Sequence, residues 1–262
     1  MPKRATPPGD GPSPSEALAF ASWSAAVWSS QLVEMVRSVI LQGSLTLGDH
    51  IPGRSDVDLL MVVDRSLEEK ELERLSQTAT AENARAPCRV DLRIVTAAAT
   101  ATPTEAPPME IYLELDPRSR PTLDGRGQRE RDLVVELSIC REHGRSLRGA
   151  APRELIAEVP HEWVVNAGDQ QLADWQLLTD DAKHAELMVL TACRIWRFHD
   201  EHIHCTKSAA GAWALARDPS LQAVRDALKR RNGDPKVSIE PDDIARLLAT
   251  VRALLAAKRS AR

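Results

Sequence analysis

The spacing of apolar residues predicts that helices and strands alternate in the first part of the chain. Between positions 15 and 37, apolar residues recur at roughly helical spacing, which indicates a helix. A short apolar run at 38–42 predicts a buried strand that ends in a tight turn at Gly43 and Ser44. Further strands are expected at 56–63 and 88–95, with a polar helix at 66–84 between them.

The pattern changes after residue 95. Residues 96–131 contain clustered prolines and threonines, which predicts a connector with one short element at 109–115. The remainder favours helices, expected at 132–147, 183–198 and 242–258. We therefore predict a disordered N-terminus (1–14), a first domain (15–115), a linker (116–130) and an α-helical bundle domain (131–262).

Composition narrows the class of protein. A chain of 262 residues with 43% hydrophobic residues can form two domains of ordinary size. The net charge of -4 argues against a nucleic-acid surface, which is usually basic. The four cysteines form no CxxC pair, and neither a signal peptide nor a membrane-spanning run is found. We expect a cytoplasmic monomer that binds neither nucleic acid nor membrane.

Three aspartates suggest nucleotide chemistry. Asp56 and Asp58 are two residues apart in a predicted strand, so both carboxylates face the same side and repel each other unless a cation lies between them. Mg²⁺ suits this role, since it is usually held by one or two carboxylates together with substrate phosphates. If the next strand lies alongside, Asp91 completes a three-carboxylate face, either as a general base or as a ligand of a second metal.

The turn before these aspartates is the second part of the pattern. Gly43 allows the backbone to approach a phosphate closely, and Ser44 offers a hydroxyl and an N–H group. Taken singly, the turn is better explained as an ordinary loop and the aspartates as a solvated strand face. Their combination, just before an apolar run, favours a nucleotide site.

These segments carry a resemblance to a known family. The stretch GSLTLGDHIPGRSDVDLLMVV is similar to the GS-x-DxD signature of polymerase-beta-like nucleotidyltransferases. In the second half, DLVVELSICREHGRSLRG, ADWQLLTDD and LTACRIWRFHDEHIHCTKSAAGAWAL resemble the helical domain of streptomycin 3″- and spectinomycin 9-adenylyltransferases. The resemblance covers about residues 38–218. It implies an α+β fold, in which a polymerase-beta-like domain of mixed sheet and helices precedes an α-helical bundle.

The resemblance also implies roles for single residues. Asp56 and Asp58 would bind Mg²⁺, with two ions expected, and Asp91 stands where the family has a glutamate that acts as catalytic base. Ser44 and Ser55, with Gly43, would contact the phosphates of ATP. The family's ATP contacts in the helical domain correspond to Asp132, Arg194 and Lys207.

For the drug, the resemblance implies a second set of residues. Trp175 and Asp180 match a tryptophan and an aspartate that hold streptomycin, a ligand with guanidinium groups. A further family aspartate corresponds to His184, with Asp181 or Glu186 as replacements nearby. Tyr112 either stands in for a tryptophan of the family or is an ordinary half-buried tyrosine.

Together these patterns predict an Mg²⁺-dependent enzyme that transfers AMP from ATP to a hydroxyl of streptomycin, and of spectinomycin as a second candidate. ATP and the drug are expected in the cleft between the domains. Two alternatives remain open: an adenylyltransferase acting on a protein or another metabolite, and a non-catalytic nucleotide-binding regulator. The series His199, His202, His204, Cys205 lacks a standard zinc spacing and is not assigned to a metal.

Overall fold

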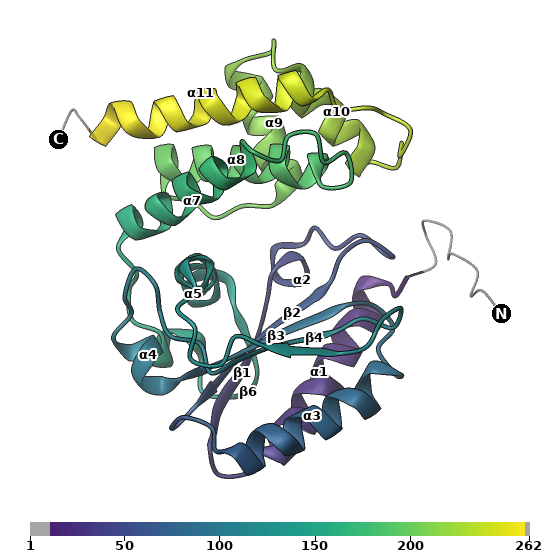
Figure 1. Ribbon diagram of the computed structural model, residues 1–262, viewed down its shortest axis with the longest axis vertical. Coiled ribbons are helices and arrows are strands. Elements are labelled where there is room, and N and C mark those ends of the chain that lie inside the picture. The colour runs from purple at the N-terminus through teal and green to yellow at the C-terminus, as the bar shows by residue number, and fades with distance from the viewer. Residues whose placement is uncertain (1–10, 260–262) are drawn as a thin grey trace. The chain divides into compact units, whose positions relative to one another are not determined.

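The protein is described here by a computed structural model, which covers residues 11–259 and forms two compact units, Met1–Val159 and Pro160–Arg262 (Figure 1). The first unit contains a mixed sheet with helices and the second is helical, so the predicted fold class is confirmed. Of the segment predicted to be disordered (1–14), residues 1–10 lie outside the described residues. Ser13 is ordered and caps the first helix, since its hydroxyl accepts a hydrogen bond from the Glu16 backbone N–H.

The first unit is built on a six-stranded sheet with the strand order β5-β4-β3-β2-β1-β6. Strands β2 and β3 are parallel, and the other neighbouring strands are antiparallel. The strands are β1 (Val36–Gln42), β2 (Val57–Val63), β3 (Val90–Thr96), β4 (Ile111–Leu115), β5 (Thr122–Asp124) and β6 (Arg145–Gly149). Its helices are α1 (Pro14–Gln31), α2 (Ser44–Leu47), α3 (Glu69–Asn83), α4 (Ala97–Ala101), α5 (Arg131–His143) and α6 (Pro152–Leu155).

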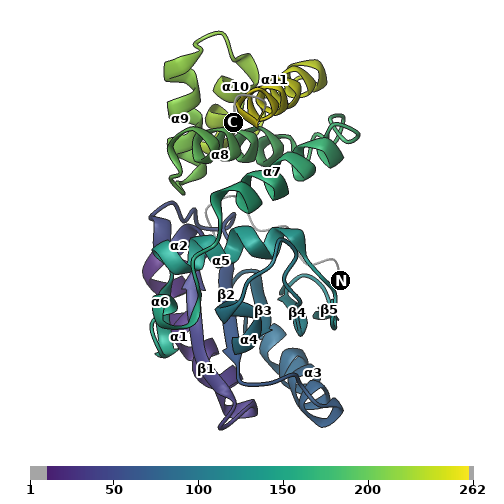
Figure 2. The same cartoon turned by 90° about the vertical axis from the view of Figure 1, so that its left-hand side faces the viewer.

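Alternation along the strands gives the sheet one apolar face and one face that carries both apolar and polar side chains. On one face Val39, Leu59 and Leu92 join α1 and α3 in a buried hydrophobic cluster. The neighbouring strand positions Gln42, Asp58, Asp91 and Arg93 face the other way, toward α5. Figures 1 and 2 show α1 and α3 on one side of the strands and α5 on the other. The chemically active side chains of this unit therefore share the α5 face.

Two predicted helices end earlier than the periodicity indicates. The helix expected at 15–37 stops at Gln31, because Glu34 has a φ of 74° and the chain then enters β1. The helix expected at 132–147 stops at His143, where the Gly144 N–H bonds the Cys140 carbonyl and the chain continues as β6. Strand β6 pairs with β1, and such long-range pairing leaves no local periodicity in the sequence.

The predicted domain boundary at 116–130 is wrong. This segment contains β5 at the sheet edge and leads into α5, which packs on β1, so both belong to the first unit. The boundary lies between Val159 and Pro160. A stretch rich in proline and charge has the composition of a linker, yet here it is a hairpin of the sheet.

The second unit is a bundle of five helices among the described residues: α7 (His161–Trp175), α8 (Ala185–Glu201), α9 (Lys207–Arg217), α10 (Gln222–Arg231) and α11 (Pro241–Arg259). Helix α8 packs against each of the other four. Three histidines of this unit take part in ring stacking: His202 stacks on His161 and His204 on Phe198, with centroid distances of 4.2 and 4.5 Å. The bundle class is confirmed, although α7, α9 and α10 had not been predicted.

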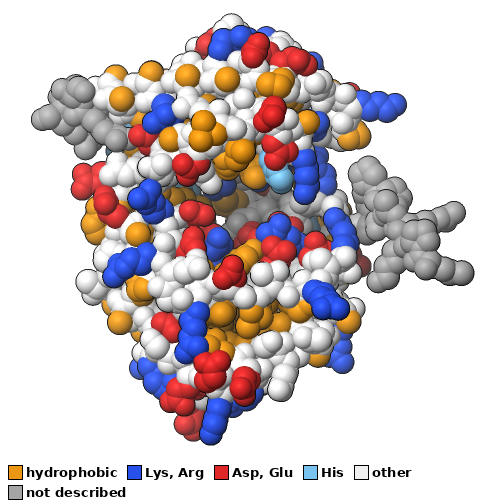
Figure 3. Space-filling view, in the orientation of Figure 1, with side chains coloured by type: hydrophobic (Ala, Val, Ile, Leu, Met, Phe, Trp, Pro, Cys, Tyr) orange, Lys and Arg blue, Asp and Glu red, His pale blue; other side chains and the backbone are white. Residues whose placement is uncertain are grey.

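The surface of the described residues carries both signs of charge. On the face seen in Figure 3, acidic and basic side chains are interspersed over both units. No helix within residues 11–259 is long and apolar enough to cross a membrane.

Candidate active site

The turn after β1 is shaped around Asp58. Gly43 has φ 70° and ψ -145°, and a Cβ built on it would lie 2.0 Å from Oδ2 of Asp58. Only glycine fits this conformation at this distance from a carboxylate. The Oγ atom of the adjacent Ser44 is buried and has no hydrogen-bond partner. Because buried hydroxyls are normally paired, this atom is a candidate for contact with a ligand.

Ser55 has a different position in the same loop. Its Oγ accepts a hydrogen bond from the Ile51 N–H at 2.9 Å, and its own N–H bonds the Ile51 carbonyl. This hydroxyl therefore shapes the loop that leads into β2. Its predicted contact with phosphate stays a prediction.

Two of the three predicted aspartates are brought together by the sheet. Asp58 is paired in register with Gln42 of β1 and with Asp91 of β3, so the expectation that the third strand lies beside the second is confirmed. Asp56 precedes β2 by one residue. Burial raises the pKa of Asp58 to about 7, and the negative charges of Asp91, Glu136 and Asp56 add to this effect. The negative charge of Asp58 is unfavourable in these surroundings, and a bound cation would compensate it.

The three aspartates do not form a metal cage by themselves. Within the described chain, no group of three or more His, Cys, Asp or Glu side chains is placed to hold a metal ion. The Asp91 carboxylate is engaged by Arg89 and Tyr112. Asp56 and Asp58 fit Mg²⁺ in its usual form, in which two carboxylates act together with phosphate oxygens. The raised pKa of Asp58 and the unpartnered Ser44 hydroxyl support this fit.

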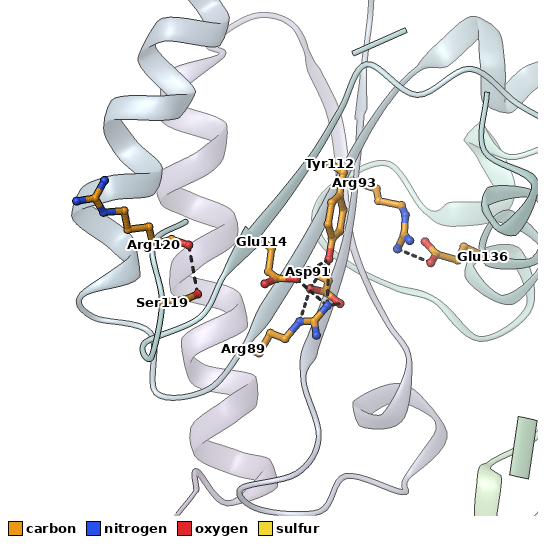
Figure 4. A network of polar contacts seen from close by, with 8 residues as sticks. All are labelled: Arg89, Asp91, Arg93, Tyr112, Glu114, Ser119, Arg120 and Glu136. Atoms are coloured by element: carbon orange, nitrogen blue, oxygen red, sulfur yellow. Dashed lines mark hydrogen bonds and ion pairs between the residues drawn. The ribbon is translucent and has the colours of Figure 1, made fainter. Parts of the chain in front are cut away.

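Asp91 lies in a network on β3 and β4 that is shown in Figure 4. Its Oδ1 accepts hydrogen bonds from the Tyr112 hydroxyl at 2.9 Å and from Nε of Arg89 at 3.0 Å. Arg89 also forms an ion pair with Glu114 at 2.8 Å. Tyr112, predicted as a substrate contact or an ordinary half-buried tyrosine, is bound to the candidate base.

A second group of residues on this face had no assigned role from the sequence. Arg93 forms an ion pair with Glu136 of α5, and Gln42 donates a hydrogen bond to Glu136 at 3.0 Å. Burial raises the pKa of Glu136, while the Arg93 charge opposes the rise. Asp132, a predicted ATP contact, lies in the first turn of α5 and is close enough to raise the pKa values of Arg93 and Glu136. The sequence held a signal for this residue: Glu136 is a charged residue within the largely apolar stretch DLVVELS.

The predicted ATP contacts of the second unit lie on α8 and α9, which pack against each other. Arg194 is a half-buried residue of α8, and Lys207 is the first residue of α9. The Arg194 charge acts to lower the pKa of Cys205, two residues before Lys207, although burial raises that pKa overall. Contact of these two cations with ATP stays a prediction.

The predicted drug residues lie in and around the α7–α8 loop. Trp175 is the last residue of α7 and is half-buried, and Asp180 is exposed in the loop. His184 caps α8 and its Nδ1 lies 2.5 Å from Oδ2 of Asp181. This contact lowers the pKa of Asp181.

One suggested replacement for the missing family aspartate is wrong. Glu186 is buried, and it forms an ion pair of 3.4 Å with Arg231, which also donates to Ser208 at 3.0 Å. Through Arg231, the Glu186 carboxylate links α8 to α9 and α10, so it is not available to bind a cationic drug. Asp181, which is half-buried, remains the candidate of the two.

A Gly-Ser turn followed by carboxylates on neighbouring strands of a mixed sheet defines a nucleotidyltransferase fold. The family model for the nucleotidyltransferase domain matches residues 29–116, and the model for the aminoglycoside adenylyltransferase C-terminal domain matches residues 154–257. The chain therefore combines a nucleotidyltransferase domain with a C-terminal domain of the aminoglycoside adenylyltransferase type.

Individual relatives agree with this assignment. The chain is 34% identical over 89 residues to aminoglycoside (3″)(9) adenylyltransferases of Klebsiella pneumoniae and Escherichia coli. Each match spans 34% of this chain and 34% of the relative, so only about a third of these relatives' length is covered. The crystal structure of spectinomycin adenyltransferase AAD(9) from Enterococcus faecialis, with ATP and spectinomycin, aligns with a TM-score of 0.70 at 16% identity. That alignment covers 92% of this chain and 99% of the other, and it shows a shared fold.

Proposed function

We propose that this protein is an Mg²⁺-dependent O-adenylyltransferase that transfers AMP from ATP to a hydroxyl of an aminocyclitol antibiotic. Streptomycin is the first candidate acceptor and spectinomycin the second. The observation that carries the proposal is the pairing of Asp58 with Asp91 on parallel strands, beside a turn whose buried Ser44 hydroxyl has no partner. The C-terminal domain assignment supports an aminoglycoside as the acceptor.

In this proposal each residue of the first unit has a defined task. Gly43 and Ser44 bind the triphosphate, and Asp56 and Asp58 hold Mg²⁺ beside it. Bound Mg²⁺ would orient the phosphates and neutralise charge on the α-phosphate. Asp91 accepts the proton of the drug hydroxyl, whose oxygen forms a bond to the α-phosphorus as the bond to pyrophosphate breaks. Asp132, Arg194 and Lys207 are proposed as further ATP contacts.

The acceptor is proposed to bind at the α7–α8 loop. The exposed carboxylate of Asp180 and the half-buried indole of Trp175 suit a guanidinium-bearing ligand, which gains from charge pairing and from cation–π contact. Exposed Asp174 and half-buried Asp181 add negative charge nearby, which attracts a polycation. His184 and Asp181 would contact the drug as a hydrogen-bonded pair.

The first test is mass spectrometry of streptomycin and spectinomycin, each incubated with the protein, ATP and Mg²⁺. We expect an AMP adduct on streptomycin, because Asp56 and Asp58 are proposed to hold the metal near the triphosphate. The Asp56→Ala, Asp58→Ala double variant serves as control and should give no adduct. If ATP binds but neither drug is modified, the acceptor is a protein or another metabolite, or, where ATP is not turned over at all, the protein is a non-catalytic nucleotide-binding regulator.

The substrate class is tested separately with a Trp175→Ala, Asp180→Ala variant. Loss of the ring and of the carboxylate should raise KM for streptomycin by about tenfold or more, since each contact contributes on the order of 1 kcal/mol. The KM for ATP should stay within about twofold if the two residues contact only the drug. Unchanged steady-state kinetics would argue that the natural acceptor is a protein or another metabolite.

A further inference from the structure

The two carboxylate oxygens of Asp91 are held unequally. Oδ1 accepts two well-placed hydrogen bonds, from the Tyr112 hydroxyl at 2.9 Å and from Nε of Arg89 at 3.0 Å. Oδ2 has only a long contact of 3.4 Å with a terminal nitrogen of Arg89. A carboxylate oxygen that already accepts two short bonds is a poor site for an incoming proton, so Oδ2 is the more basic oxygen.

The groups that hold Asp91 are themselves fixed by the sheet. Glu114, which is paired in register with Asp91, lies 2.8 Å from Arg89 and 3.2 Å from the Tyr112 hydroxyl. The guanidinium of Arg93 lies over the Tyr112 ring, 5.1 Å from its centroid. Figure 4 shows Arg89, Tyr112 and Glu114 gathered around Asp91, whereas Arg93 points toward Glu136. Because the contacts join side chains of paired strands, they restrict the rotamer of Asp91.

We propose that Tyr112 and Arg89 are positioning residues that fix Oδ1 of Asp91 and leave Oδ2 as the oxygen that takes the proton of the acceptor hydroxyl. This inference rests on the proposed function. In the step concerned, the O–H bond of the acceptor breaks and its proton goes to Oδ2. The oxygen bonds the α-phosphorus of ATP, and pyrophosphate leaves with the electrons of the broken P–O bond.

The kinetic test uses Tyr112→Phe, which removes only the hydroxyl, together with Arg89→Gln and Arg89→Lys. Turnover should fall about tenfold in Tyr112→Phe and further in Arg89→Gln, because a misoriented base loses part of its roughly 10²–10⁴-fold contribution. The KM for ATP should stay within about twofold, and Arg89→Lys should recover part of the loss. Arg126→Gln removes another arginine ion pair of this unit, with Glu69, and serves as the control with wild-type turnover. Wild-type kcat in Tyr112→Phe, or an effect on KM alone, would overturn the proposal.

A second readout needs no turnover. Tyr112 is the single tyrosine of the chain, so protein labelled with ¹³C at the tyrosine Cζ gives one NMR resonance that reports on its hydroxyl. Asp91→Ala should move this resonance, whereas Asp116→Ala, in the turn after β4, should not. An unmoved resonance in Asp91→Ala would show that Tyr112 does not hold Asp91. If the wild-type protein modifies no drug, the proposed function fails. The resonance then still tests whether the Tyr112 hydroxyl is bonded to Asp91.

Discussion

Replacing Asp58 with asparagine is expected to abolish adenylyl transfer and to stabilise the free protein at alkaline pH. The activity should fall by about 10³-fold, because the carboxylate proposed to hold Mg²⁺ is lost and metal ions typically contribute several kcal/mol to such reactions. The stability gain has a separate cause. Asp58 is buried, and Asp91, Glu136 and Asp56 lie near it, so its charge is unfavourable in the folded state.

The pH dependence of this gain follows from the raised pKa. The folded-state pKa of Asp58 is about 7, against an ordinary value of 3.8, so the folded protein holds this proton more tightly than the unfolded chain does. Stability from this group is complete below about pH 4 and is lost as the pH rises to 7. Asp58→Asn removes the loss, so its gain should be near zero at pH 4 and roughly 2–4 kcal/mol at pH 8.

This gain is measured by urea denaturation with EDTA and without nucleotide. Asp64→Asn is a matched control, since Asp64 follows β2 directly and forms an ion pair with Arg37. The control should show no gain at pH 8. If Asp58→Asn is no more stable than the wild type at pH 8, neither burial nor the neighbouring carboxylates disfavour the charge of Asp58, and the prediction is wrong.

Gly43→Ala is expected to have the second largest effect. Its Cβ would lie 2.0 Å from Oδ2 of Asp58, and the backbone conformation at Gly43 is one that L-residues rarely adopt. The chain must shift, which displaces the Asp58 carboxylate and the Ser44 hydroxyl together. Adenylyl transfer should drop about 100-fold or more, because a displacement of about 1 Å is enough for such a loss. Steady-state kinetics and an ATP-binding titration measure the two consequences.

Gly48→Ala is the matched control for this prediction. Gly48 also has a positive φ, 77°, but a Cβ there meets nothing within 4 Å. This substitution should cost only about 1 kcal/mol of stability and leave turnover near the wild-type value. Equal losses of activity in both variants would mean that backbone strain, rather than the contact with Asp58, causes the loss in Gly43→Ala.

The tertiary structure changed several interpretations of single residues. From the sequence, Tyr112 and Glu186 were both candidates for contact with the drug. In the fold, Tyr112 reaches Asp91 across a strand pair, whereas Glu186 is buried against Arg231. Each outcome depends on a partner more than 20 residues away in the chain. Local spacing holds no information on such partners.

The sequence by itself determined where the first three strands lie along the chain, the turn at Gly43 and Ser44, the position of Asp58 beside Asp91 on neighbouring strands and the helical nature of the second half. These features depend on local periodicity and on short motifs, which act within a few residues. Only the tertiary structure decided that 116–130 belongs to the sheet, that β6 follows α5, and that Arg93 and Glu136 form an ion pair beside Asp58. Strand pairing and buried ion pairs join distant segments, and their free energy depends on burial and geometry that arise only when the chain has folded.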